Sequence, residues 1–311
     1  MTTRGALFCP GGSMRVVVTG WASFLHGEAT AGDVASLQRV AARLADDGIE
    51  HDVVWSPGFA PGSTHFDDVD PSDYTHLLFC CGPVHGWQVE DLHHRFFECT
   101  RIAVGVSVVD PESPAARCFH RLLPRDGPGL RSSRDLAAGL RHREVPVLGA
   151  VLAPDQPEYG DSARHEQAHD LLQHWLSGLD AARVPLDTRL AHDDWRHCAT
   201  PEAFASLIAR TDLVVTTRLH GLVFALSEGV PAIAVDPVTG GGKVTAQAQA
   251  HDWPAVLGPG SLSREELDHW WDWCRSDAGA RRAAEVRDAA GTGPALLDAV
   301  ARELHASLLD Q

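Results

Sequence analysis

The chain has 311 residues, which is long for a single hydrophobic core and suits two α/β domains. Hydrophobic residues make up 44% and charged residues 22%, so we expect a soluble globular protein. The formal net charge of −16 and the lack of a basic stripe argue against a nucleic-acid partner and against binding to an anionic membrane surface. A negatively charged ligand therefore needs a local cluster of cations.

The cysteines and the amino terminus indicate the compartment. The seven cysteines show no CxxC spacing and form an odd count, which favours reduced thiols over a disulfide framework. No stretch has the roughly 20 apolar residues that cross a bilayer, and MTTRGALFCPGGS lacks the apolar region of a signal peptide. We therefore expect a cytoplasmic protein without membrane insertion, whose folded part starts near Met14.

The first half alternates short apolar runs with amphipathic stretches, the pattern of a parallel sheet flanked by helices. Apolar side chains at helical spacing and a following Gly predict a helix over 32–48. The Pro/Gly/Arg-rich stretch from Pro124 to Arg143 is expected to connect two domains, the first covering residues 14–143. Strands are predicted over 14–21, 51–56, 75–82 and 101–109, with a short helix inside 85–99.

A second alternation of the same kind starts at residue 145 and predicts a second domain over 144–275. Gly229 is expected to end the helix 219–228. The helices of 276–311 are expected to pack across the domains. Two Rossmann-like domains facing each other across a cleft are the predicted architecture. Strands are predicted over 145–154, 183–188, 212–217 and 231–236, and helices over 162–179, 200–210, 219–228 and 262–276.

The sequence RLHG at 218–221 places two cation-capable side chains where a strand turns into a helix. Ligands of open α/β sheets bind beyond the carboxyl ends of the strands, and a helix start adds a partial positive charge there. Arg218 offers a planar fork of donors for phosphate or carboxylate, and His220 can donate to an oxyanion or move a proton. Gly221 lets the backbone or a ligand come close. In the alternative interpretation, Arg218 pairs with an acid such as Asp212 and His220 packs in the core.

Lys243 is the only lysine among 26 basic residues and ends a Gly-Gly-Gly-Lys run. The run is no Walker A loop, because Pro stands at 237 where its first Gly belongs and Val244 replaces the Ser or Thr that binds magnesium. The loop VTGGGKV follows the strand 231–236 and should bring Lys243 to the same sheet edge as Arg218 and His220. Three cations would then converge.

These pieces resemble the polysaccharide pyruvyl transferase family. The resemblance rests on RLHG at 218–221, on GVPAIAVDP at 229–237 and on the basic loop that ends at Lys243. HGEATAGD, ending in Gly32-Asp33, and PRDGP at 124–128 stand where the family has a Gly-Asp loop and an Arg-Asp turn, although Thr30 replaces a common Asn. The family is similar in architecture to glycosyltransferases of the two-Rossmann-domain B type.

The resemblance implies that phosphoenolpyruvate is the donor and that hydroxyls of a sugar-type acceptor receive the pyruvyl group as a ketal, with release of phosphate. It implies that Arg218 and Lys243 hold the phosphate and carboxylate, and that His220 is a phosphate ligand and the acid. No cofactor and no metal are implied.

Four residues of the first domain complete the expected site. Asp33, at a helix start, and Glu28, in the same loop, are the candidate bases that take the acceptor proton. His85 and Arg125 are further candidates for contacts to the anion.

Two other functions stay open at this point: a glycosyltransferase that uses a nucleotide-sugar donor, and a non-catalytic ligand-binding relative. HEQAH at 165–169 matches the H-E-x-x-H zinc pattern, but its charged flanks and the Trp at position 175 argue against a metalloprotease. The sequence leaves the acceptor unnamed and a homo-oligomer open.

Overall fold

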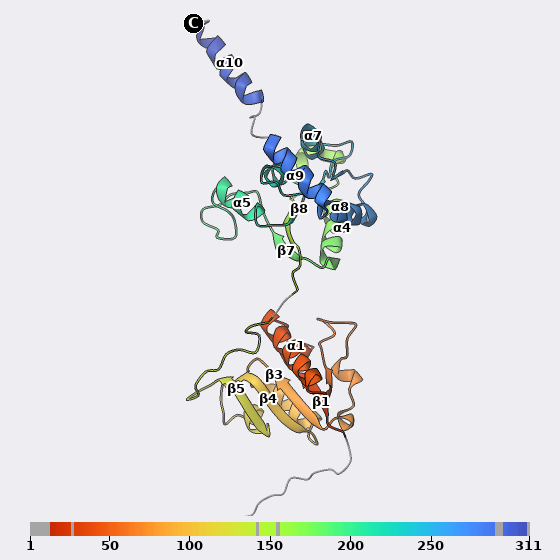
Figure 1. Cartoon of the computed structure of the whole chain (residues 1–311), viewed down its shortest axis with the longest axis vertical. Helices are drawn as coiled ribbons and strands as arrows, with labels where there is room; N and C mark the ends of the chain where they lie inside the picture. Colours follow the sequence, from red (N-terminus) through yellow and green to blue (C-terminus); the bar gives the residue numbers. More distant parts are fainter. Residues whose placement is uncertain (1–12, 26–27, 141–142, 154–155, 290–294, 310–311) are drawn as a thin grey trace, which may run out of the picture. The chain divides into compact units, whose positions relative to one another are not determined.

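The computed structural model describes residues 13–25, 28–140, 143–153, 156–289 and 295–309. The chain divides into two compact units, Met1–His142 and Arg143–Gln311, and each has its own parallel sheet and hydrophobic core (Figure 1). The predicted α/β class with two parallel sheets is confirmed.

The first unit contains a five-stranded sheet in the order β2-β1-β3-β4-β5, in which all neighbours run parallel. Its strands are β1 Arg15–Thr19, β2 Glu50–Val53, β3 His76–Cys80, β4 Thr100–Ser107 and β5 Arg121–Asp126. Its helices are η1 Trp21–Ser23, α1 Ala31–Asp46, η2 Phe66–Asp68, η3 Pro71–Asp73, α2 Trp87–Arg95 and α3 Pro114–Arg117.

Alternate side chains of the first sheet enter two different cores, because successive residues of a strand point to opposite faces. On one face Val16 and Val18 of β1 are buried with Leu37 of α1. On the other face Val17 of β1 and Phe79 of β3 belong to a cluster that includes residues of α2 and α3. The sheet is therefore covered on both sides by apolar packing.

The prediction that Pro124–Arg143 connects the domains is wrong at its start, because Pro124 to Asp126 are the last residues of β5. β5 is an edge strand with one neighbour, β4, and a proline is tolerated on such an edge because its missing N–H faces away from the ladder. Alternation in RLLPRD is too short to stand out from the Pro- and Arg-rich surroundings, so the fifth strand was not predicted.

The second unit contains a five-stranded parallel sheet in the order β10-β9-β8-β6-β7. Its strands are β6 Val147–Val151, β7 Ala182–Pro185, β8 Leu213–Thr216, β9 Ala232–Val235 and β10 Val256–Leu257. Its helices are η4 Pro157–Ser162, α4 His165–Gly178, α5 Pro201–Ile208, α6 Leu219–Ser227, α7 Lys243–Ala250, α8 Arg264–Cys274, α9 Asp277–Ala289 and α10 Ala295–Leu309.

The central strands β8 and β9 are buried at every residue, as expected for a parallel sheet with helices on both faces. α6 ends one residue before the predicted position, and Gly229 then takes a left-handed φ of +72° that other residues rarely adopt. α9 packs against α6 and α8 within this unit. Each helix of the described residues is too short or too polar to span a membrane.

Candidate active site

The centre of the second sheet has the topology at which open α/β sheets bind ligands. From β6 the chain moves outward to β7, whereas from β8 it moves in the opposite direction to β9 and β10. The carboxyl ends of β6 and β8 therefore form a switch point. They are joined there, because the Thr217 N–H donates to the Val151 carbonyl at 3.1 Å and the Ala153 N–H donates to Thr217 Oγ1 at 2.7 Å.

Arg218 follows this switch point and is the N-cap residue of α6. Its backbone N–H donates to Thr216 Oγ1 at 2.9 Å, which fixes the turn from β8 into the helix. The side chain is only 18% exposed, and its Nη2 lies 3.6 Å from Asp187 Oδ1. Nε is buried and has no hydrogen-bond partner among the described residues. The guanidinium thus keeps donor capacity for a ligand.

Asp187, just after β7, is the acid that pairs with Arg218. Arg189 Nη2 lies 2.6 Å from Asp187 Oδ2, and His197 Nε2 lies 3.8 Å from the same oxygen. Burial of Asp187 favours its neutral form, but the hydrogen bonds from Arg189 and the charge of Arg218 outweigh burial and lower the pKa of the carboxyl. The alternative interpretation that Arg218 pairs with an acid is thus confirmed, but the acid is Asp187 and not Asp212, whose carboxylate accepts from the backbone N–H of Val147 at 2.7 Å.

His220 is the second residue of α6, and its side chain is exposed rather than packed in the core. It lines a cavity of about 180 Å³. The other walls of this cavity come from the chain after β7, from α5 and from α6: Thr188, Leu190, Pro201, Phe204 and Phe224. Among the described residues that line this small and mostly apolar cavity, His220 is the one with a titratable side chain.

Gly221 allows α6 to start close to the sheet. An added Cβ would overlap Thr216 Oγ1 and would lie 3.0 Å from Thr216 Cβ and 3.1 Å from a methyl carbon of Val151. The glycine is thus required for the close approach of the helix to β6 and β8. This agrees with the prediction that Gly221 lets the backbone come close.

Lys243 is the first residue of α7, so the prediction that it lies in a loop is wrong. Its Nζ lies 3.8 Å from Glu158 Oε1 and 5.6 Å from the centre of the Tyr159 ring, and the side chain is 40% exposed. Lys243 and Arg218 thus contact different partners in the same unit. Their convergence on one ligand stays a prediction.

The glycine-rich segment before Lys243 surrounds an anion of the protein itself. Asp236 is 1% exposed, and its carboxylate accepts from the backbone N–H groups of Val238 at 3.1 Å, Gly242 at 2.7 Å and Thr245 at 2.8 Å. The carboxylate therefore takes the place at the start of α7 where a phosphate could otherwise bind. The Gly242 amide is therefore engaged by the protein, and Lys243, which pairs with Glu158, is the cationic side chain at this start of a helix.

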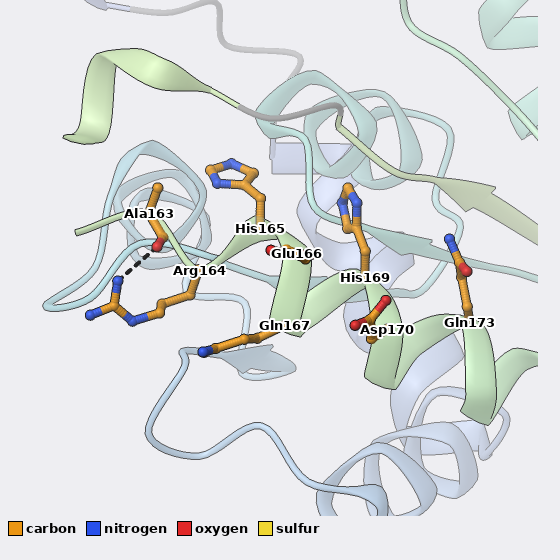
Figure 2. A pocket seen from close by; sticks show the side chains of 8 residues that line it. All are labelled: Ala163, Arg164, His165, Glu166, Gln167, His169, Asp170 and Gln173. Carbon is orange, nitrogen blue, oxygen red and sulfur yellow. Dashed lines mark hydrogen bonds between the residues drawn. The ribbon is translucent and has the colours of Figure 1, made fainter. Parts of the chain in front are cut away.

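A larger cavity of about 640 Å³ runs along the first turns of α4, the helix that follows β6 (Figure 2). Figure 2 shows the rings of His165 and His169 on the same side of α4, with Gln173 one turn further along. His169 Nε2 lies 3.5 Å from Thr217 Oγ1, so a residue that lines this cavity also contacts the switch point. His165 is buried beside Tyr159, whose ring centre is 6.5 Å away.

These two histidines belong to the HEQAH sequence and were not predicted as site residues. The signal was available, because α4 is the helix after the first strand of the second sheet and its amino end must lie at the carboxyl edge. Among the described residues, no group of three or more His, Cys, Asp or Glu side chains is arranged to hold a metal ion.

The predicted bases of the first unit stand at the start of α1. Thr30 is the N-cap residue, and its Oγ1 accepts from the backbone N–H of Asp33 at 3.2 Å and donates to Asp33 Oδ2 at 2.7 Å. Asp33 is half-buried and Glu28 is exposed. Asp33 is thus a helix-capping carboxylate, and its predicted role as a base stays a prediction.

The two further anion candidates of the first unit have different surroundings. His85 is exposed, between β3 and α2. Arg125 of β5 is engaged by the protein, because it donates to Asp126 at 2.7 Å, to Ser107 at 2.7 Å and to Asp135. These contacts raise the pKa of Arg125, and they favour a structural role over binding of a ligand.

Solved structures similar to the chain include a rhamnosyltransferase, a glycosyltransferase and a heptosyltransferase. The spinosyn rhamnosyltransferase SpnG complexed with thymidine diphosphate is 13% identical, covers 92% of this chain and 100% of its own, and has a TM-score of 0.35. The calicheamicin glycosyltransferase CalG4 is 15% identical, covers 95% of this chain and 98% of its own, and has a TM-score of 0.31. The E. coli heptosyltransferase WaaC with ADP is 16% identical, covers 84% of this chain and 99% of its own, and has a TM-score of 0.25. Likenesses at this level carry no argument about activity.

Comparison by sequence gives a more specific result. No curated protein matches the sequence. One family model matches a segment that contains Arg218, His220, Asp187 and His169 but stops before Lys243. Residues 153–237 of the second unit match the polysaccharide pyruvyl transferase family.

Proposed function

We propose that this protein is a pyruvyl transferase that uses phosphoenolpyruvate as donor and hydroxyls of a sugar-type acceptor. The observation that carries the proposal is the half-buried Arg218 at the switch point, with a buried Nε that lacks a partner among the described residues. A guanidinium in such a place, at the start of α6, suits a phosphate or a carboxylate. The family match over residues 153–237 supports the same conclusion.

Each cationic side chain has a role in the proposed reaction. Arg218 and Lys243 bind the phosphate and the carboxylate of phosphoenolpyruvate. His220 donates a proton to the methylene carbon, which becomes a methyl group and leaves the adjacent carbon electron-poor. Two acceptor hydroxyls then form two C–O bonds to that carbon, and the bond to the phosphate oxygen breaks. Of the two hydroxyl protons, one replaces the proton given by His220 and the other leaves with phosphate.

The size of the cavity beside His220 favours a small donor over a nucleotide-sugar. Its volume of about 180 Å³ is below the roughly 300–1,000 Å³ typical of pockets for larger ligands. Its apolar walls, which include Leu190 and Phe224, suit the methylene end of phosphoenolpyruvate. His220 lines the same cavity, which supports its proposed role as the donor of the proton to that carbon.

A thermal-shift titration tests the donor. A ligand at 100 times its dissociation constant stabilises a protein by about 2.7 kcal/mol. We expect phosphoenolpyruvate to raise the melting temperature, and we expect Arg218→Ala to remove this shift. The matched control is Arg281→Ala on the exposed part of α9, which should keep it. Stabilisation by UDP or a UDP-sugar instead of phosphoenolpyruvate would replace the proposal with the glycosyltransferase reading.

Transfer is tested by phosphate release and by mass spectrometry of the acceptor. Wild type is incubated with phosphoenolpyruvate and a panel of methyl glycosides and UDP-sugars. We expect phosphate release that depends on one acceptor, together with the mass gain of one ketal-linked pyruvyl group. His220→Asn should retain binding of phosphoenolpyruvate and lose transfer. Saturable binding without release for every acceptor would favour a non-catalytic relative.

A further inference from the structure

His169 lies between the switch point and the cavity along α4. Its Nε2 is 3.5 Å from Thr217 Oγ1, and its half-buried ring lines the 640 Å³ cavity (Figure 2). Thr217 precedes Arg218 directly, so the imidazole stands one residue from the proposed anion site. A titratable side chain is thus held at the border between the donor side and an open polar cavity.

The contact with Thr217 leaves one imidazole nitrogen for chemistry. Thr217 Oγ1 already accepts from the Ala153 N–H at 2.7 Å and has a second lone pair. When Nε2–H of His169 donates to that lone pair, Nδ1 keeps its own lone pair and can accept a proton. A base oriented by a hydrogen bond on its far nitrogen is the arrangement that proton-transfer sites use.

The cavity that His169 lines suits a molecule with many hydroxyl groups. Asp170 and Gln173 line the same cavity as His169, and their carboxylate and amide groups can both bind hydroxyls. The cavity volume exceeds that beside His220, and it leaves room for a sugar ring. We infer that the cavity along α4 is the acceptor subsite and that His169 takes the proton from the attacking hydroxyl, an inference that rests on the proposed function.

The titratable groups that act on His169 are His165 and Asp170, both on α4. The uncharged hydroxyl of Thr217, after β8, contacts its Nε2, and Tyr159 of η4 lies beside His165. Burial and the neighbouring His165 lower the pKa of His169, although Asp170 acts in the opposite direction. The imidazole is therefore neutral at pH 7, as a base must be, and it accepts the proton when the acceptor oxygen bonds to the electron-poor carbon.

The proton then has a defined fate. The acceptor O–H bond breaks, its oxygen forms the C–O bond to the pyruvyl carbon, and the proton moves to His169 Nδ1. After phosphate leaves, the imidazolium releases this proton to phosphate or water, so no other reactant is required. His220 and His169 thus act as acid and base on the two sides of the same reaction, and Asp33 and Glu28 are not needed for it.

The test compares His169→Asn and His169→Ala with the matched control His174→Asn, an exposed histidine of the same helix. We expect kcat to fall by about 10²- to 10⁴-fold in both His169 variants. Phosphoenolpyruvate should still raise their melting temperature as in wild type. Imidazole added to His169→Ala should restore part of kcat, and the fall of kcat at acid pH, centred below about pH 6.5 in wild type, should vanish in the variants. His174→Asn should match wild type, and Gln173→Ala should raise the acceptor KM with kcat retained.

Several outcomes would overturn the inference. Full kcat in His169→Asn, or loss of kcat without rescue by imidazole and with an unchanged pH profile, would make His169 a packing residue. Loss of transfer in Asp33→Asn together with full activity in His169→Asn would return the base to the first unit. A wild-type melting temperature that phosphoenolpyruvate does not raise is a different result, because it would overturn the proposed function along with this inference.

Discussion

Gly221 has no side chain because α6 begins against the carboxyl ends of β6 and β8. A methyl group at this position would overlap Thr216 Oγ1, which donates to the carbonyls of Val151 in β6 and of Arg218. We expect Gly221→Ala to lower the free energy of unfolding by about 1–3 kcal/mol, the usual cost of overpacking. Urea unfolding measures the change. Gly178→Ala is the control, since an added Cβ at this last residue of α4 meets nothing within 4 Å, and an equal loss in both variants would contradict the explanation.

Asp236 organises the segment that leads to Lys243. Its buried carboxylate binds three backbone N–H groups, and Asp236→Ala would leave these donors without their acceptor. Hydrogen bonds to charged groups contribute about 1.5–3 kcal/mol each, so we expect a loss of roughly 3 kcal/mol in the free energy of unfolding after water enters. The exposed Asp272→Ala should stay within about 0.5 kcal/mol of wild type. Equal stability of the two variants would show that the carboxylate is dispensable.

At the residue scale, the sequence predicted the cation pair but not its partners. Arg218 and His220 were found because a strand followed directly by a helix fixes the sheet edge at which both must lie. The partner of Arg218 was not found, because Asp187 is distant in sequence and reaches Arg218 only through the sheet order. His169 was set aside with the zinc pattern, since the spacing of HEQAH carries no information about which cavity the helix borders.

At the scale of elements, the amino end of β1 is tied to β2 and to the residue after η3. Arg15 Nη2 lies 2.8 Å from Asp52 Oδ2, and the Tyr74 hydroxyl donates to the same oxygen at 2.8 Å. Burial and the bond to Asp52 raise the pKa of Tyr74 to about 12. Because the unfolded pKa is about 10, the neutral phenol stabilises the fold fully below that pH, and this stability is lost as the pH rises towards 12.

Ultraviolet titration of the phenol and urea unfolding between about pH 9 and 12 check this expectation. Tyr74→Phe should lack the phenol ionisation near pH 12. It should also lose the part of the fall in the free energy of unfolding that this ionisation causes. Only two tyrosines occur in the chain, so the spectrum is simple to assign. Ionisation of Tyr74 near pH 10 would contradict the half-buried hydrogen bond to Asp52.

Most elements could be predicted because buried parallel strands such as LVVT and AIAV are short continuous apolar runs between polar helices. The failures share a physical cause, which is that contacts from outside an element decide its local state. β5 is a strand because β4 pairs with it, despite Pro124. Lys243 begins α7 because Asp236, just after β9, accepts from the backbone N–H groups of Gly242 and Thr245 at the start of the helix.

At the scale of the whole molecule, each hydrophobic cluster of the described residues lies entirely within one of the two units. The second unit buries its own core around β8 and β9, and Arg218, His220, Lys243 and His169 all belong to it. We expect residues 143–311 expressed alone to fold and to be stabilised by phosphoenolpyruvate in an Arg218-dependent manner. Circular dichroism and thermal shift check this. A folded fragment that ignores phosphoenolpyruvate, while the full chain responds, would show that the first unit supplies part of the donor site.

Because Lys243 is the only lysine, ligand binding at the proposed site can be followed by the NMR signal of one labelled side chain. Reductive methylation with ¹³C-formaldehyde would place labelled methyl groups on Lys243 and on the terminal amine, and on no other side chain of this sequence. Lys243 lies over the ring of Tyr159, so its methyl signal would carry a ring-current shift that the terminal amine lacks. Titrating phosphoenolpyruvate would then shift this one assigned resonance. Because arginine takes the place of lysine elsewhere in the chain, the Lys243 signal alone reports whether the proposed site is occupied.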